Sequence, residues 1–287
     1  MSFKGGTSLS KGWNLIFRFS EDIDVAIRRE GRFAISGTSK NQLAKARRTA
    51  RHYVIRELPQ ELTTILTETG ISGFTVIPET TKERNGTITE LRADTHPSVI
   101  YVNYNSVIPE TSEYVKPRVK IEISSLSMDE PVETRTLRSF ISEAVPDAED
   151  MEIRFKTVIP TRTFLEKIFL LHEEFQKKNP RSYRMSRHLY DIERIMDTSF
   201  GNEALKDLKL YDEIIAHRNI FNHIDGVDYS SHNHDRINFI PPTELMDDWK
   251  DDYKSLEEHF LYSSATHLSF DQLLERMHEL LRRIRQI

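Results

Sequence analysis

The chain has 287 residues, of which 38% are hydrophobic and 30% charged, with no cysteine and a formal net charge of -5 at pH 7. It contains no apolar run of about 18 residues and no basic segment followed by an apolar one, which argues against a membrane span and against export. The lack of cysteine excludes a disulfide framework. We therefore expect a cytoplasmic protein with no membrane contact. The negative charge argues against nonspecific coating of nucleic acid but leaves room for a local basic cleft.

The first predicted element is a strand that ends at Lys4, followed by a turn over Gly5, Gly6, Thr7 and Ser8. A glycine pair before small hydroxyl residues lets backbone N–H groups approach a phosphate closely. Apolar residues at helical spacing then predict a helix over residues 8–17. This order of elements indicates the opening of an α/β domain with a phosphate-binding turn.

The next strand is predicted over residues 22–27, where apolar and polar residues alternate. Its two carboxylates, Asp22 and Asp24, point to the same face because side chains alternate along a strand. Closely placed carboxylates suit Mg²⁺ or Mn²⁺, which phosphoryl and nucleotidyl transfer require. A lone Asp-x-Asp pair is commonly part of a surface strand, but the glycine turn ahead of it favours a site for triphosphate and metal.

A basic helix with an apolar stripe is predicted over residues 39–58. We interpret its charged side as an ordinary solvated face. Strands are predicted over 72–78 and 97–103, and the polar segment between them has a hairpin signal at Asn85-Gly86.

The run over residues 118–123 alternates polar and apolar residues and predicts another strand. Lys120 and Glu122 lie on its polar face. If this strand pairs beside the Asp22 strand, Glu122 could complete a carboxylate triad with Asp22 and Asp24.

The remainder of the chain, after a strand at 153–158, is predicted to be helical. An irregular stretch over 226–242 interrupts it. The pattern indicates an α+β fold with two lobes, residues 1–158 and residues 159–287. Helices are predicted over 160–175, 186–198, 211–222, 244–260 and 270–287.

Charged residues on two of these helices are candidates for phosphate binding. Lys167 interrupts the apolar stripe of the first, and Arg187, Asp191 and Arg194 share one face of the second. A lysine and an arginine can neutralise charge on a leaving pyrophosphate, and an aspartate can orient them or accept a proton. An intrahelical salt bridge between Arg187 and Asp191 explains the same spacing equally well.

Histidines and aspartates gather in the loop-rich stretch after residue 216, so a zinc or manganese site is one interpretation. Their spacing is a weak signal and no cysteine accompanies them, which favours ordinary solvated histidines. Trp13 and Trp249 are interpreted as core residues. The residues concerned are His217, His223, His232, His234, Asp225, Asp228 and Asp235.

Five motifs together match one known family. They occupy residues 3–12, 18–24, 118–122, 162–167 and 186–192. In these motifs the sequence resembles the AbiEii/AbiGii toxin family of bacterial nucleotidyltransferases, a branch of the polymerase-beta-like superfamily. The resemblance spans nearly the whole chain.

The resemblance implies a polymerase-beta-like nucleotidyltransferase domain with a mixed sheet, a C-terminal helical domain, and an active site between them. It implies Mg²⁺-dependent or Mn²⁺-dependent transfer from an NTP, GTP or CTP, to an acceptor that in characterised branches is the 3′ end of tRNA. A toxin of this kind serves a toxin-antitoxin or phage-abortive-infection system and has a cognate antitoxin. Motif by motif, the resemblance assigns metal binding to Asp22 and Asp24, catalysis to Lys120, Glu122, Lys167 and Asp191, and the phosphate turn to Gly6, Thr7 and Ser8. We also predict that Arg18, Ser20 and Arg187 bind the nucleotide.

Two departures from the family pattern affect the first motif. Thr7 and Asp22 are further apart than in many polymerase-beta-like enzymes, although this spacing suits the toxin branch. Similar proteins also carry a helix and most of a strand ahead of the glycine turn. We therefore expect further in-frame coding sequence upstream of Met1, because a short strand anchors a turn poorly.

Two other functions fit the same residues. A kinase would transfer the γ-phosphoryl group from the same pocket to protein, including its own Ser20 or Thr7. A catalytically idle nucleotide-binding module would instead hold a partner protein. The presence of the acidic and basic candidates together argues against the idle module, which has no chemical need for the full set.

Overall fold

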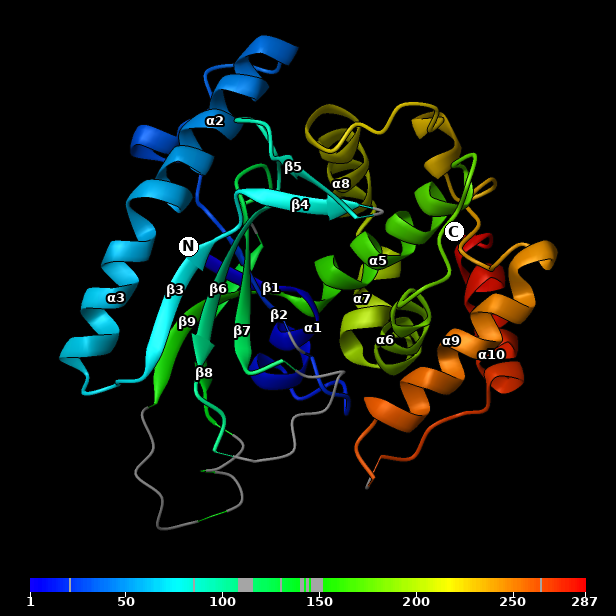
Figure 1. Cartoon of the computed structure of the whole chain (residues 1–287). Coiled ribbons are helices and arrows are strands. Elements are labelled where there is room, and N and C mark those ends of the chain that lie inside the picture. The colour runs from blue at the N-terminus through cyan, green and yellow to red at the C-terminus, as the bar shows by residue number, and fades with distance from the viewer. Residues whose placement is uncertain are drawn as a thin grey trace. The chain divides into compact units, whose positions relative to one another are not determined.

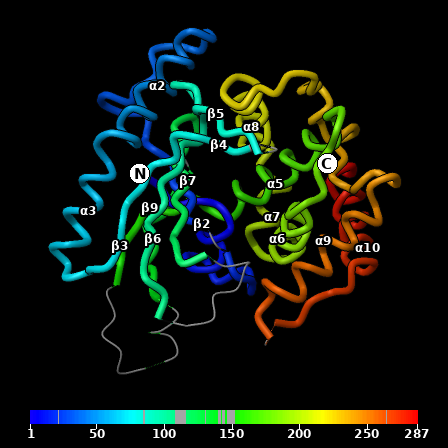
Figure 2. Tube along the Cα trace, viewed as in Figure 1, coloured from blue at the N-terminus to red at the C-terminus, as the bar shows by residue number. Residues whose placement is uncertain are grey.

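The computed structural model describes residues 1–20, 22–84, 86–107, 116–129, 131–139, 142, 145, 152–263 and 265–287. The chain divides into two compact units. Unit 1 comprises Met1–Thr7 and Glu21–Asp129, and unit 2 comprises Ser8–Ser20 and Glu130–Ile287. Figure 1 labels the elements of both units and Figure 2 traces the chain through them. The domain boundary at residue 158 stays a prediction.

Unit 1 is built on a mixed sheet with the strand order β3-β6-β7-β2-β1. Strands β2 and β7 run parallel, whereas the other pairs within this order are antiparallel. The α+β class and the mixed sheet are thereby confirmed, as are the strands predicted after the glycine turn. The strands are β1 (Ser2–Lys4), β2 (Asp22–Ala26), β3 (Phe74–Pro78), β6 (Ser98–Tyr104) and β7 (Arg118–Ser124).

The predicted hairpin is also present, formed by β4 (Thr81–Arg84) and β5 (Thr87–Glu90). Gly86 has a φ of 75°, which a glycine accepts in a tight turn. Asn85, the other residue of the hairpin signal, lies outside the described residues.

Two helices cover one part of the unit 1 sheet, α2 (Lys40–Arg56) and α3 (Leu58–Glu68). Helix α2 contacts β6 and α3 contacts β3 (Figure 1). The Ser39 side chain caps α2 through a capping box with Gln42. The sequence predicts only one helix here, over 39–58. Pro59 lies in the first turn of α3, where proline is tolerated, so a second helix begins where the first ends.

Unit 2 contains a strand hairpin and a set of packed helices. Helix α5 contacts α6, α7 and α8, and α6 contacts α9 and α10. Phe164, Ile168 and Trp249 are fully buried in this core, so the interpretation of Trp249 is confirmed. The elements are β8 (Val132–Leu137), β9 (Ile153–Val158), α5 (Pro160–Phe175), α6 (Ser186–Met196), α7 (Ser199–Lys206), α8 (Leu208–Phe221), α9 (Met246–His259) and α10 (Phe270–Ile284).

The helix predicted over residues 8–17 is wrong in extent. A single α-helical turn, α1 (Gly5–Thr7), is followed by a π-helical turn, η1 (Ser8–Gly12), and no helix continues to residue 17. Asn14 adopts a left-handed conformation with a φ of 52°, which ends helical structure and which asparagine tolerates.

Short 3₁₀ turns complete the described structure: η2 (Gly31–Phe33), η3 (Tyr229–His232) and η4 (Thr243–Leu245). Within the described ranges, every helix is too short or too polar to cross a bilayer.

Candidate active site

The predicted acidic residues of unit 1 lie side by side on adjacent strands. The register pairs Asp24 of β2 with Lys4 of β1 and with Glu122 of β7, and it pairs Asp22 with Lys120. Residues directly opposite each other in a sheet project to the same face. Asp22, Asp24, Lys120 and Glu122 therefore form one polar patch, which we call the acidic face.

Lys120 neutralises part of the acidic face. Its Nζ lies 3.4 Å from Asp22 Oδ2 and also donates a short hydrogen bond to Glu122 Oε1. Burial lowers the pKa of Lys120, but the hydrogen bond and charge of Glu122 and the charge of Asp22 outweigh it, so the pKa is raised overall. The side chains of Asp22, Lys120 and Glu122 are 21%, 29% and 28% exposed, so solvent reaches them.

The glycine turn lies against this face. Gly5 has a φ of +75°, and a Cβ at this position would fall 2.1 Å from Asp24 Oδ2. Only glycine fits such an approach without displacing the carboxylate. Next to it, Thr7 Oγ1 donates a hydrogen bond of 2.5 Å to the backbone carbonyl of Asp22. The turn is thus hydrogen-bonded to Asp22 and lies close against Asp24.

The donor set of the acidic face fits a hard divalent ion. Asp22 and Asp24 supply carboxylate oxygens on a half-buried strand end, which is the ligand chemistry that Mg²⁺ and Mn²⁺ prefer. Glu122 engages Lys120 instead of forming a triad. In the part of the chain that is described, no three His, Cys, Asp or Glu side chains converge as a metal-binding group.

A second set of predicted site residues meets inside unit 2. Asp191 of α6 accepts hydrogen bonds from Arg18 Nε at 2.7 Å and Arg18 Nη2 at 2.8 Å, and Lys167 Nζ of α5 lies 2.8 Å from Asp191 Oδ2. The three residues are 0%, 3% and 7% exposed, in the order Asp191, Arg18 and Lys167. We call them the buried ion triad.

Main-chain hydrogen bonds hold Arg18 in place. Arg18 forms an isolated antiparallel bridge with Leu261, and the Phe19 N–H donates to the Phe260 carbonyl at 2.7 Å. A segment close to the N-terminus is in this way joined to the segment that follows α9. Local sequence patterns do not indicate this pairing, because the two segments are far apart in the chain.

Electrostatics fix the charge states of the triad. Burial raises the pKa of Asp191, but the charges of Arg18 and Lys167 outweigh it and hold the pKa well below its usual range. Asp191 is therefore poorly suited to accept a proton and well suited to orient its two partners. Burial lowers the pKa of Lys167, and the charge of Asp191 opposes that shift.

His188 is a neighbour of the triad that the sequence did not reveal. Its Nδ1 lies 3.4 Å from Lys167 Nζ. Burial, with the charges of Lys167 and Arg187, lowers the pKa of His188 well below its usual value, so the ring is neutral near pH 7. Its position three residues before Asp191, one helical turn away, was the available signal.

The other predicted residues occupy separate positions. Ser8 is fully buried, whereas Ser20 and Arg187 are half-buried. Both oxygens of Asp191 are engaged from outside α6, so its carboxylate links three segments of unit 2 instead of serving only an intrahelical bridge. The Arg194 guanidinium lies 5.5 Å from the centre of the Phe17 ring.

The histidine-rich stretch is structural. His232 is fully buried, with Nε2 3.3 Å from Glu173 Oε1, so its interpretation as a solvated histidine is wrong. Its ring stacks on Tyr229, and His234 stacks on Tyr211. Aromatic packing and a buried carboxylate explain why these imidazoles gather.

Comparisons with known proteins bear on the family and the fold of the chain. The family model described as nucleotidyl transferase AbiEii toxin, type IV TA system, matches residues 1–276. Among solved structures, the chain is similar to MenT4, a nucleotidyltransferase toxin from Mycobacterium tuberculosis H37Rv, with a TM-score of 0.51 and 13% sequence identity over 100% of this chain and 75% of that chain. At this identity the likeness shows the fold alone. Among curated proteins no match is found.

Proposed function

Because the chain belongs to the AbiEii family of nucleotidyltransferase toxins of type IV toxin-antitoxin systems, we propose that it transfers a nucleotide from GTP or CTP to the 3′ end of tRNA. The observation that carries this proposal is the acidic face: Asp22 and Asp24 lie on one strand, and the glycine turn packs directly against Asp24. The family also implies a cognate antitoxin and an NTP substrate.

In the proposed reaction a hydroxyl oxygen of the acceptor forms a bond to the α-phosphorus, and the bond between the α-phosphorus and the bridging oxygen breaks. Pyrophosphate leaves, and the hydroxyl proton passes to solvent. Asp22 and Asp24 would hold Mg²⁺ or Mn²⁺, which neutralises triphosphate charge when bound. Correct positioning of the two reactants supplies much of the rate enhancement in such transfers.

The proposal also covers the remaining predicted residues. We propose that Gly6, Thr7 and Ser8 position the phosphates and that Lys120 and Glu122 balance charge beside the aspartates. Lys167 and Arg187 are proposed to bind the triphosphate. In the same proposal Asp191, whose lowered pKa keeps it ionised near pH 7, orients Lys167 and Arg18.

The test is incubation of the protein with each α-labelled NTP, Mg²⁺ and total tRNA, followed by a gel. Asp22→Asn and Asp24→Asn should each lower label transfer by several orders of magnitude, because each removes a charged metal ligand from the site. Asp94→Asn is the matched control: the Asp94 side chain is 22% exposed in unit 1, against 21% for Asp22, and pairs with Arg92. Its activity should be unchanged.

Two results would contradict the proposal. Full transfer by both aspartate variants would remove the metal-binding role from the acidic face. Incorporation of label from γ-labelled but not α-labelled NTP would identify a kinase. A cytoplasmic location in the bacterial cell remains part of the proposal and is accessible by fractionation.

A further inference from the structure

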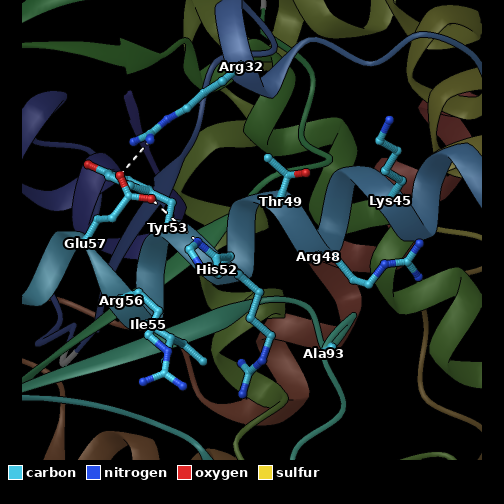
Figure 3. A pocket seen from close by; sticks show the side chains of 11 residues that line it. Arg32, Lys45, Arg48, Thr49, His52, Tyr53, Ile55, Arg56, Glu57 and Ala93 are labelled. Atoms are coloured by element: carbon cyan, nitrogen blue, oxygen red, sulfur yellow. Dashed lines mark hydrogen bonds and ion pairs between the residues drawn. The ribbon is translucent and has the colours of Figure 1, made fainter.

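A strongly basic pocket opens along α2 in unit 1, and none of the site residues assigned above is among its described lining residues. Its volume is about 590 Å³, and Figure 3 shows most of its side chains projecting from successive turns of α2, with Arg32 and Ala93 contributed by other segments. Five cationic side chains line it, and Glu57 is the one carboxylate among the described lining residues. The local charge is thus +4 with His52 neutral, on a chain whose net charge is -5. The five cations are Arg32, Lys45, Arg48, Arg51 and Arg56.

Three of these cations form a row that we call the α2 basic stripe: Lys45, Arg48 and Arg56. Their spacing places them on one face of the helix, over about 16 Å of its length. All three are exposed, and none makes an ion pair with a residue in the described part of the chain. The row therefore presents uncompensated positive charge to solvent.

Glu57 does not neutralise the stripe, because its carboxylate is already engaged. Glu57 Oε2 lies 2.7 Å from Arg32 Nη1, and Oε1 lies 3.6 Å from His52 Nδ1. The Arg32 guanidinium also lies 4.5 Å from the centre of the Tyr53 ring. The Glu57 carboxylate therefore pairs with Arg32 and His52 and with none of the three stripe cations.

Arg51 is the buried cation of the pocket. It is 4% exposed, its Nη2 donates to the Glu79 carbonyl at 3.1 Å, and its Nη1 has no hydrogen-bond partner among the described residues. The other buried arginines of the described chain are each paired with a carboxylate, Arg18 with Asp191 and Arg162 with Glu166. Arg51 forms no ion pair with a described carboxylate: the charge of Glu79 acts on it, but its contact with Glu79 is to the main-chain carbonyl. A buried guanidinium nitrogen without a partner is unfavourable, so Arg51 Nη1 can take a further acceptor.

The helix that carries the α2 basic stripe and Arg51 is held by its cap and by its buried side. A capping box fixes its first turn, and Ala50 and Val54 are buried on the side that packs toward the sheet. A rigid row of cations can keep a fixed spacing relative to a repeating ligand. A single small anion would occupy only one of these positions, whereas the regularly spaced phosphates of a nucleic-acid strand can occupy several.

We propose that the pocket along α2 binds the phosphate backbone of the RNA acceptor. On binding, the Arg51 side chain shifts so that Nη1, which is buried in the free protein, donates to one phosphate oxygen, and the α2 basic stripe follows the neighbouring phosphates. Contacts of this kind set the position of the RNA and carry no sequence information. The inference rests on the proposed function, since it takes the acceptor to be RNA.

The experiment measures binding of fluorescently labelled total tRNA by anisotropy, without NTP, at several salt concentrations. The test variant is the double substitution Lys45→Gln and Arg48→Gln, which changes two exposed side chains. It should weaken binding about tenfold and reduce the slope of log affinity against log salt by about 1.5, since each lost phosphate contact removes about 0.7 to 0.9 from the slope. Lys40→Gln is the matched control, because Lys40 is exposed on the same helix outside the pocket. Its binding should equal that of the wild type.

Arg51→Lys extends the test to the buried cation. It retains the charge but removes the planar donor group, so it should weaken tRNA binding while circular dichroism and the melting temperature show a folded protein. NTP binding by the wild type and by the double variant should be equal.

The outcomes separate the two proposals. Tight tRNA binding by the wild type with an unchanged affinity and salt slope in the double variant would overturn the α2 site and leave the tRNA acceptor intact. A wild type that binds no tRNA yet transfers nucleotide to another acceptor would overturn both. Loss of NTP binding in the double variant, with tRNA binding retained, would place the nucleotide in this pocket and also overturn the inference.

Discussion

Gly5 illustrates how a single residue constrains the acidic face. It combines a φ of +75° with a position where a Cβ would fall 2.1 Å from Asp24 Oδ2. The first property concerns backbone strain, and the second concerns the position of a proposed metal ligand. The two effects can be separated, because Gly70 has a φ of +82° and a Cβ added there would meet nothing within 4 Å.

We expect Gly70→Ala to lower the free energy of unfolding by about 1 to 2 kcal/mol, since it forces alanine into the left-handed region, and Gly5→Ala to lower it by at least as much, because its Cβ also collides with Asp24. Only Gly5→Ala should also reduce nucleotide transfer, because the Asp24 carboxylate must move. Urea unfolding and the α-label assay measure the two quantities. Equal activity in both variants would show that the contact of Gly5 with Asp24 does not matter for the reaction.

Asp191 raises the question of whether a predicted catalytic residue is also a structural one. Asp191→Asn would leave the buried cations Arg18 and Lys167 without their counter-ion. Breaking a buried ion pair in this way costs about 3 to 5 kcal/mol, so we expect a loss of stability of that order.

Asp197→Asn is the control, because the Asp197 side chain is 61% exposed and pairs with Arg276 and Arg283. Exposed pairs contribute roughly 0 to 1 kcal/mol. Wild-type stability in Asp191→Asn, combined with lost activity, would assign it a purely catalytic role.

Alternation and helical periodicity predicted the strands and helices in which apolar residues form one buried face. Strand β7 and helices α5 and α10 are examples. Strand β8 was missed because its sequence, Val-Glu-Thr-Arg-Thr-Leu, contains few apolar residues and most of its side chains reach solvent. Helix α7 was missed because it is only 8 residues long. Short or half-exposed elements take their conformation from neighbours that local patterns do not encode.

The candidate site was likewise predictable only where local sequence patterns decide the position of a residue. The sequence placed Asp22 and Asp24 on one face of a strand and Lys120 and Glu122 on one face of another, and motif resemblance added the catalytic role of Lys120 and Glu122. It did not reveal that Lys120 bridges Asp22 and Glu122, because this contact depends on the parallel register of β2 with β7. The pairing of Arg18 with Asp191 was equally hidden, since 173 residues separate them.

The register of β2 with β7 leads to a prediction about metal affinity. Lys120→Gln removes the ammonium group between Asp22 and Glu122 and so makes the acidic face more negative. We expect Mn²⁺ to bind several-fold more tightly in the absence of nucleotide, as measured by isothermal titration calorimetry, and nucleotide transfer to slow. Lys82→Gln, on the β4 strand of the same unit, should leave both quantities unchanged. Weaker Mn²⁺ binding in Lys120→Gln would mean that Lys120 organises the carboxylates instead of competing with the ion.

Across the molecule, both compact units contain a histidine that burial keeps neutral. In unit 1, His96 Nε2 accepts a hydrogen bond from the Ser125 N–H at 3.0 Å, and burial, with the charges of Lys4 and Arg47, lowers the pKa of His96 to about 4. In unit 2, His172 Nε2 lies 2.8 Å from Ser231 Oγ, and burial, with the charge of His232, lowers the pKa of His172 to about 4. Both units should therefore respond to acid in the same direction.

The sign follows from proton binding in the two states. The unfolded chain binds a proton on His172 below its ordinary pKa of 6.5, whereas the folded protein does so only near pH 4. The unfolded state thus holds more protons in this window, and stability falls as the pH falls through it. Between about pH 7 and pH 5, His172 alone should account for a loss of about 2 kcal/mol.

We expect the free energy of unfolding of the wild type, measured by urea denaturation, to decrease between about pH 7 and pH 5. His172→Gln should be less stable at pH 7, because its hydrogen bonds to Ser231 and Asn238 are lost, but its stability should fall less steeply with acid. His278→Gln is the control, since His278 is exposed on α10 and its replacement should leave the slope unchanged. If wild type and His172→Gln lose stability in parallel, His172 titrates alike in the folded and unfolded states and its burial does not govern the acid response.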